Sequence, residues 1–368
     1  MKSLFPEIDT PVLLIEKIIV ENNIQDMQML MNKHHVKLRP HIKTHKSPYL
    51  ANIQLKAGAV GIACAKVSEA MVFAKAGIKD IQIANIIVGE KKFENLNKLT
   101  KITNKISCCV DSIDNAKLLA DYFEKKKKII NVLIIVDCGY HRCGYEDYNK
   151  ILELAEYIKR RKSINLLGIT THAGQAYSSS TNEERVNIAK HEGNLMVHFA
   201  DKLRKAGIEI KEVIIGSNPT VRESCKVKGV TEIRTGNYIF NDMIQVSLGT
   251  VKMNSCALTV LSQVISIPSK NRVIIDAGSK TFSSDKGAHG NETLKGFGFI
   301  IGKNAIIEKL SEEHGIIKHQ NEKFKIGERL RIIPNHACTT TNMFEKAYLV
   351  EKDKIIQEIE ISARGKSQ

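Results

Sequence analysis

The stretch Leu38-Arg39-Pro40-His41-Ile42-Lys43-Thr44-His45-Lys46 places a lysine where an apolar run gives way to a helical pattern that starts at Ser47. We therefore expect Lys43 to lie where a strand ends and a loop begins. Burial and cationic neighbours lower the pKa of an amine and make it nucleophilic. Lys43, flanked by two histidines, is a candidate for Schiff-base chemistry. Taken alone, the segment is explained as well by a basic surface run.

Short apolar runs and amphipathic segments alternate outward from this stretch. Eight runs predict strands: Val36–Ile42, Ala59–Ala65, Asp80–Asn85, Lys105–Asp111, Asn131–Asp137, Asn165–His172, Glu212–Gly216 and Thr231–Thr235. The segments between them predict helices: Pro48–Lys56, Ser68–Ala76, Lys92–Ile102, Ile113–Lys125, Tyr148–Arg160, Glu183–Lys205 and a short one at Val221–Cys225. This alternation indicates a parallel sheet with helical crossovers. We predict an α/β fold, a (β/α)8 TIM barrel. A doubly wound sheet is second choice because no glycine-rich dinucleotide fingerprint follows the first strand.

The pattern changes after about Gly249, where short strands follow one another with little helix between them. Predicted strands there are Cys256–Pro268, Arg272–Ala277, Ala305–Glu308, Glu328–Ile333, Ala347–Glu351 and Lys354–Ile361. A further strand, Val12–Ile15, precedes a helix that runs from about residue 16 to residue 32. We expect a barrel over residues 12–248 and a β-domain over residues 249–368 that includes residues 1–11.

Composition narrows the possible functions of the 368-residue chain. The formal charge is +15, but the excess is lysine spread along helix faces, aromatic residues make up 5% and there is no tryptophan. We therefore expect no nucleic-acid partner. No apolar run is long enough for a membrane span, and the N-terminus has no secretory signal. Eight cysteines without C-x-x-C spacing read as reduced thiols, so we expect a cytoplasmic protein.

Catalytic groups of such barrels lie at the carboxyl ends of the strands, and the loops after strands seven and eight commonly bind phosphate. Here these loops are Gly216-Ser217-Asn218-Pro219-Thr220 and Gly236-Asn237-Tyr238. Their small and hydroxyl residues suit an anion, although each loop alone is also ordinary turn chemistry. Together with Lys43 they suggest pyridoxal 5'-phosphate. Arg142, after strand five, could contact the phenolic oxygen or the nitrogen of its ring, or form a surface ion pair.

A second group of candidate residues lies in the β-domain, within Ile333-Pro334-Asn335-His336-Ala337-Cys338. We expect this segment to be extended, so that His336 and Cys338 point to the same side. Imidazole and thiolate are zinc ligands, and a two-residue site leaves positions for water and substrate. Buried structural His and Cys side chains are the simpler alternative.

The chain resembles the D-serine dehydratase / D-threonine aldolase family, which has the fold of alanine racemase. The shared motifs run along nearly the whole chain: Asp9–Pro11, Arg39–Lys46, Lys66–Ala70, Asp137–Gly139 with Arg142 and Gly144, His172–Gly174, Gly216–Ser217 with Pro219–Thr220, Gly236–Tyr238, Asp276–Ser279, Ser311–Gly315 and Pro334–Cys338. One departure is Asn218, where many relatives carry threonine.

The resemblance implies a role for each matching position. Lys43 would be the Schiff-base lysine. Residues in cofactor contact would be Lys43, Arg142, Gln175, Tyr177, Ser217, Thr220, Gly236 and Asn237. His336 and Cys338 would be the metal pair. It also implies a homodimer with a small-molecule D-amino acid substrate.

The second metal ligand separates two branches of the family. Aldolases tend to carry aspartate there, which suits manganese or magnesium, whereas dehydratases tend to carry cysteine, which suits zinc. Cys338 therefore favours a D-serine dehydratase (an ammonia-lyase) with Zn²⁺, and Mn²⁺ or Mg²⁺ as alternatives. A D-threonine aldolase that releases glycine and an aldehyde is the second choice. An amino-acid racemase and a non-catalytic pyridoxal-phosphate carrier are further alternatives.

Overall fold

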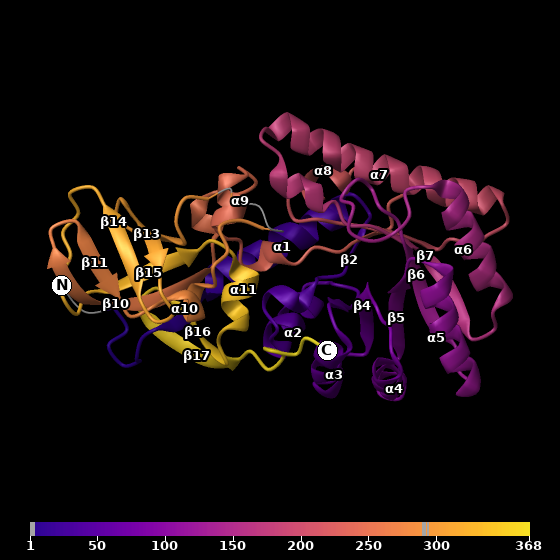
Figure 1. Cartoon of the computed structure of the whole chain (residues 1–368), viewed down its shortest axis with the longest axis horizontal. Coiled ribbons are helices and arrows are strands. Elements are labelled where there is room, and N and C mark those ends of the chain that lie inside the picture. Colours follow the sequence, from indigo (N-terminus) through magenta and orange to yellow (C-terminus); the bar gives the residue numbers. More distant parts are fainter. Residues whose placement is uncertain (1–3, 289–291, 293) are drawn as a thin grey trace. The chain divides into compact units, whose positions relative to one another are not determined.

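The computed structural model describes residues 4–288, 292 and 294–368, which form two compact units (Figure 1). Of these described residues, one unit comprises 27–43, 51–236 and 365–368, and the other comprises 4–26, 44–50 and those within 237–364. Residues 1–3, part of the segment 1–11 that we assigned to the β-domain, lie outside the described residues. In the part of the chain that the structure describes, no helix is long and apolar enough to cross a membrane.

The first unit is built on eight parallel strands, as the sequence predicted. They are β2 (Lys37–Leu38), β3 (Ile62–Cys64), β4 (Asp80–Ile86), β5 (Lys105–Val110), β6 (Ile130–Ile135), β7 (Ile164–Thr170), β8 (Glu212–Ile215) and β9 (Glu232–Ile233). The order across the sheet is β2-β9-β8-β7-β6-β5-β4-β3. Backbone N–H groups of Val60 and Ala63 donate to the carbonyls of Leu38 and Pro40, and these bonds join the two end strands into a ring. The predicted barrel is confirmed.

Helices flank the parallel strands (Figure 1). They are α1 (Lys17–Lys33), α2 (Pro48–Lys56), α3 (Val67–Lys75), α4 (Glu90–Leu99), α5 (Ile113–Lys125), α6 (Tyr148–Arg160), α7 (Asn182–Lys205) and α8 (Val221–Ser224). The buried side chains of α6 recur at helical spacing: Ile151, Leu154, Ala155 and Ile158. One face of α6 therefore packs on the sheet while its charged face meets water. α5 begins with a capping box between Ser112 and Asn115.

Arg39 joins strand ends inside the barrel unit. Its Nε donates to Glu232 at 2.8 Å and its Nη1 donates to Asp80 at 2.6 Å. Burial raises the pKa of Glu232, and the guanidinium partly offsets that rise. Removing the arginine would leave Glu232 buried without its cation, which is costly in a poorly solvated site.

The second unit is an antiparallel β-domain. Its strands are β1 (Val12–Glu16), β10 (Leu258–Ser269), β11 (Arg272–Ile275), β12 (Gly298–Ile300), β13 (Ala305–Leu310), β14 (Gly315–His319), β15 (Arg329–Pro334), β16 (Lys346–Glu351) and β17 (Lys354–Glu360). The order is β11-β14-β13-β12-β15-β10-β1-β16-β17, and β11 also pairs with β10. Six strands thus close a ring, which β1, β16 and β17 extend. Short helices α9 (Met243–Ser247), α10 (Ser279–Phe282) and α11 (Ala337–Asn342) complete the unit.

The position of β1 differs from our expectation that the barrel starts at residue 12. β1 pairs antiparallel with β10 and parallel with β16. Its central side chain, Leu14, is fully buried in a cluster with Phe5, Leu261 and Val350. The strand lies in the β-domain because these apolar partners are there, and a short apolar strand followed by a helix carries no signal of which sheet it joins.

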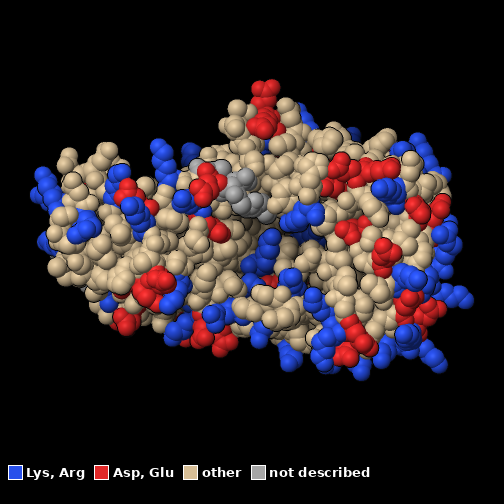
Figure 2. Space-filling view, viewed as in Figure 1, with Lys and Arg blue, Asp and Glu red and all other residues tan. Residues whose placement is uncertain are grey.

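Charged groups of both signs are interspersed over the face shown in Figure 2. The excess of lysine and arginine is therefore not gathered into one basic patch on that face.

Candidate active site

Lys43 lies at the end of the segment that follows β2, as the sequence predicted. It occupies the middle of a short 3₁₀ helix, η1 (Ile42–Thr44). The backbone N–H of Lys43 donates to Nδ1 of His41 at 3.3 Å. That contact fixes the backbone at the lysine and gives His41 a local structural role rather than a metal-binding one.

The loop after β8 carries the predicted phosphate residues, and its geometry is set by a buried glutamate. Glu192, on α7, accepts a hydrogen bond from the N–H of Gly216 at 3.1 Å and from Oγ1 of Thr220 at 2.8 Å. Gly216 has φ of +144°, and a Cβ there would lie 2.9 Å from the backbone of Arg234. The position therefore requires glycine.

Two predicted polar groups of the barrel unit have unsatisfied atoms. Among the described residues, no hydrogen-bond partner is within reach of Oγ of Ser217 or Oε1 of Gln175, although both atoms are buried. Buried polar atoms normally have a partner, so Oε1 of Gln175 can accept a hydrogen bond from a bound molecule, and Oγ of Ser217 can accept or donate one. Asn218 instead accepts a bond from the hydroxyl of Thr235 at 3.0 Å, which ties the loop after β8 to the strand-nine end.

Arg142, Gln175 and Tyr177 come from two neighbouring loops. The guanidinium of Arg142 lies 5.1 Å from the centre of the Tyr140 ring. That ring covers Gly174, where a Cβ would come within 2.6 Å of it. Nε2 of Gln175 donates to the carbonyl of Cys138 at 2.9 Å, and Tyr177 is buried in the 3₁₀ helix η2 (Gly174–Ser178). The structure therefore brings the loops after β6 and β7 together.

Asn237 belongs to the β-domain unit and lies in the 3₁₀ helix η3 (Asn237–Ile239). Its Nδ2 donates to Asp242 at 2.6 Å, and among the described residues its buried Oδ1 has no partner. Oδ2 of Asp242 also accepts the N–H of Ala337 at 2.9 Å. One buried carboxylate therefore holds both Asn237 and the first turn of α11.

The segment with His336 and Cys338 is not extended throughout, which corrects our expectation. His336 is extended, but Cys338 lies in the first turn of α11. Two hydrogen bonds start this helix: Asp242 accepts the N–H of Ala337, and the carbonyl of His336 accepts the N–H of Thr340. The two side chains still interact. Burial lowers the pKa of His336, but the Cys338 thiolate and Asp285 outweigh it and raise that pKa to about 10.

Each of these two side chains has a further partner within the β-domain unit. Nδ1 of His336 donates to Oδ2 of Asp285 at 2.7 Å. Oγ1 of Thr44, the residue after Lys43 in the chain, lies 3.2 Å from Sγ of Cys338. A metal ion would take the place of the proton on Nε2, with Nε2 of His336 and Sγ of Cys338 as the two donor atoms.

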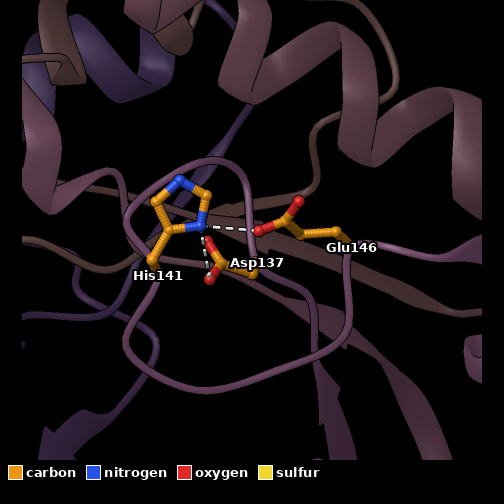
Figure 3. A group of neighbouring side chains, drawn as sticks. All are labelled: Asp137, His141 and Glu146. Carbon is orange, nitrogen blue, oxygen red and sulfur yellow. Dashed lines mark ion pairs between the residues drawn. The ribbon is translucent and has the colours of Figure 1, made fainter.

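A different cluster has the spacing of a three-ligand metal site (Figure 3). Nδ1 of His141 lies 2.6 Å from Glu146 and 3.8 Å from Asp137. His141 and Glu146 are exposed, and Asp137 already accepts the N–H groups of Gly139 and Tyr140 in a turn. Turn geometry accounts for this arrangement, and we assign it no metal.

Sequence reasoning missed Glu192, Asp242 and Asp285. Glu192 did leave a signal, since it stands at helical spacing within the buried stripe of α7 between Ala189 and Met196. Asp242 and Asp285 lie in irregular segments, where the sequence carries no period.

The two units together define the class of the protein. A family model for the alanine racemase N-terminal domain matches residues 17–243, and one described as a putative serine dehydratase domain matches residues 257–350. A solved alanine racemase of Clostridium difficile has a TM-score of 0.70 over 96% of this chain and 98% of its own at 15% identity, a likeness of fold. The protein has the alanine racemase fold.

Closer relatives place it within that class. A D-threonine aldolase of Arthrobacter sp. is 33% identical over 98% of this chain and 94% of its own length, and a D-serine dehydratase of Dictyostelium discoideum is 31% identical over 95% of each. The solved D-threo-3-hydroxyaspartate dehydratase from Delftia sp. HT23 has a TM-score of 0.92 and 30% identity over 98% of this chain and 99% of its own. The chain belongs to the D-serine dehydratase / D-threonine aldolase family and is a lyase.

Proposed function

We propose that this chain is a pyridoxal-phosphate- and metal-dependent D-serine dehydratase, which converts a β-hydroxy D-amino acid into a 2-oxo acid and ammonia. The observation that carries the proposal is the contact between His336 and Cys338, because a thiolate as second donor favours zinc and, within this family, the dehydratase branch. Dehydratases are among the relatives that match this chain over nearly its whole length.

The residues at the strand ends fit pyridoxal 5'-phosphate. Lys43 is an amine at the end of the first barrel strand segment. Ser217 offers a buried hydroxyl whose hydrogen-bonding capacity is unused among the described residues. Lys43 would bind the aldehyde covalently. The remaining contacts would come from Arg142, Gln175, Tyr177, Ser217, Thr220, Gly236 and Asn237.

His336 and Cys338 fit a divalent metal. With Nδ1 of His336 engaged by Asp285, Nε2 is the nitrogen that would bind the metal once it loses its proton. Imidazole and the soft Cys338 thiolate both suit Zn²⁺, with Mn²⁺ or Mg²⁺ as alternatives. The Delftia dehydratase gives support from outside this chain. The structure of its variant with one cysteine replaced by alanine is in the metal-free form, and another solved variant replaces a histidine two positions before that cysteine.

The chain's own groups would divide the reaction between them. The chemistry that cofactor and metal supply is a sink for the electron pair left at Cα and a Lewis acid at the β-hydroxyl. Lys43, displaced by the substrate amine, would take the proton from Cα. His336 and Cys338 would hold the metal at the hydroxyl that leaves. The water lost there is balanced by the water that releases ammonia, so D-serine yields pyruvate and ammonia.

Retro-aldol cleavage is a second candidate activity, because a D-threonine aldolase of Arthrobacter sp. matches 98% of this chain at 33% identity. Product analysis separates the two. The purified protein, supplied with pyridoxal phosphate and Zn²⁺ or Mn²⁺, is incubated with D-serine, D-threonine and D-3-hydroxyaspartate. We expect a 2-oxo acid and ammonia. Glycine with an aldehyde, and no 2-oxo acid, would reject the dehydratase.

The role of Lys43 has its own test. Borohydride reduction followed by peptide mass spectrometry should place the cofactor on the peptide that contains Lys43. Lys43→Ala should abolish both the adduct and the visible absorbance of the bound cofactor, whereas the exposed Lys37→Ala should keep them. An adduct that persists in Lys43→Ala would show that another lysine binds the cofactor.

We also propose that the protein is a cytoplasmic homodimer. Its ligand would be a small D-amino acid and not a nucleic acid. All eight cysteines are free thiols, which suits a reducing compartment. The interspersed charges of Figure 2 suit a small-molecule enzyme better than a nucleic-acid-binding surface.

A further inference from the structure

Asp285 contacts His336 and Thr339 through a single carboxylate oxygen. Oδ2 lies 2.7 Å from Nδ1 of His336 and accepts the Thr339 hydroxyl at 2.9 Å. The same oxygen therefore accepts two hydrogen bonds, one from the imidazole and one from the hydroxyl. Thr339 lies on α11, one residue after Cys338. Asp285 therefore touches both the histidine and the helix that carries the thiolate.

The position of Asp285 is fixed from its backbone as well. Its N–H donates to Oγ of Ser283 at 3.3 Å, and its carbonyl accepts Nδ2 of Asn335 at 3.1 Å. Asn335 is buried and directly precedes His336. Oγ of Ser283 in turn donates to Oγ1 of Thr339 at 3.1 Å. The main chain of Asp285 is thus held by Ser283 and Asn335 and its carboxylate by Thr339, so more than one bond sets its position beside the ring.

This geometry determines which nitrogen of His336 is available. A carboxylate has no proton to give, so Nδ1 must carry the hydrogen of the bond to Asp285. In the neutral imidazole the lone pair is then on Nε2, and the bond to Asp285 also stops the ring from turning about Cβ–Cγ. Without this bond the ring could rotate, and fixing its orientation on metal binding would cost free energy.

We propose that Asp285 is a positioning residue, which fixes the tautomer and the ring orientation of His336 so that Nε2 is presented to a divalent metal. The inference rests on the proposed function, since it takes His336 and Cys338 as the metal pair. Asp285 does not bind the metal and touches no substrate. Its effect is on metal affinity. Loss of a side chain that hydrogen-bonds a metal-binding histidine typically changes that affinity 10- to 100-fold.

The experiment measures metal binding directly, by competition between the holoenzyme and a chromophoric chelator for Zn²⁺ and, separately, by the thiolate absorbance of the Co²⁺-loaded protein. Asp285→Ala should bind both metals about 10- to 100-fold more weakly, while activity at saturating metal returns to within a few-fold of wild type. The metal affinity of Asp285→Asn should fall between those of wild type and Asp285→Ala, because the amide oxygen still accepts the Nδ1 proton but carries no charge. Exposed Asp353→Ala in the β16–β17 turn is the matched control and should bind like wild type.

Failures of the two proposals look different. If His336→Ala and Cys338→Ala bind metal as tightly as wild type, the metal pair of the proposed function is wrong. If those two variants lose the metal while Asp285→Ala keeps wild-type affinity, the pair stands and the role of Asp285 is refuted. Should Asp285→Ala fail to fold, Asp285→Asn decides the question, and wild-type affinity in that folded variant overturns the inference.

Discussion

Glu192 is a single side chain that sets the shape of the loop after β8. It is fully buried on α7, and its oxygens accept the N–H of Gly216 and the hydroxyl of Thr220. Burial raises its pKa from 4.5 to about 7, and the bonds from Thr220, Gly216 and Ala173 limit the rise. Through these bonds Glu192 fixes the proposed phosphate loop. Ionisation of this buried group lowers the stability of the fold.

The pH dependence of this effect follows from the pKa of Glu192 in the unfolded chain and in the folded protein. Between pH 4.5 and about 7 the folded protein keeps a proton on Glu192 that the unfolded chain has lost. The contribution of this group is therefore most favourable at low pH and falls as pH rises, by roughly 3 kcal/mol in all.

We predict that Glu192→Gln removes this slope. The amide cannot ionise, and the Thr220 hydroxyl, which also lies 3.2 Å from the carbonyl of Ser217, can turn to accept from it. Denaturant unfolding at pH 5 and pH 8 should show wild type losing roughly 3 kcal/mol more than the variant. Exposed Glu183→Gln on the same helix is the control and should follow wild type. Parallel pH curves for wild type and Glu192→Gln would show that Glu192 is ionised at all these pH values.

At the scale of single elements, helices were easier to predict than the short strands of the β-domain. Pro48–Lys56, Ile113–Lys125 and Tyr148–Arg160 begin and end where their apolar period does. Strands β12 and β14 were missed because three to five residues with glycine at the start show too little alternation to stand out. The helical start of α11 depends on Asp242, far away in the sequence, and no local pattern indicates it.

Strand β7 approaches β8 unusually closely at Gly168. A Cβ at this position would lie 1.9 Å from the carbonyl oxygen of Glu212, which is backbone and cannot rotate away. Gly168→Ala must therefore push the two strands apart.

We predict that Gly168→Ala lowers the free energy of unfolding by about 1–3 kcal/mol or more. Asn165→Ala, at an exposed position of the same strand, should stay within about 0.5 kcal/mol of wild type. Urea unfolding followed by circular dichroism measures both. A wild-type midpoint for Gly168→Ala would show that the two strands can separate at little cost.

At the scale of the whole chain, neither unit is a continuous segment. The chain passes from one unit to the other at residues 26/27, 43/44, 50/51, 236/237 and 364/365. One of these passages falls between Lys43 and Thr44, the residue whose hydroxyl contacts Cys338. Sequence patterns located the barrel strands and predicted that His336 and Cys338 interact. They did not predict where the chain passes between the units, because an element's own sequence does not reveal which distant element it pairs with.

The pairing of β1 gives a prediction at this scale. A chain that ends at Glu345 lacks β16 and β17, so β1 keeps β10 but loses its partner on the other side. Its exposed edge and the apolar Leu14 cluster should make the protein aggregate. A chain that ends at Gly365 retains both strands and should remain monodisperse in gel filtration. Equal behaviour of the two truncations would show that β16 is dispensable for burying β1.

The place of β1 also governs how the protein is made. Residues 12–16 are synthesised roughly 330 residues before one of their strand partners, residues 346–351. At about 5–20 residues per second the nascent chain waits on the order of 20–70 s for that partner. Until β16 is made, β1 can pair only with β10, and its other edge is available to chaperones.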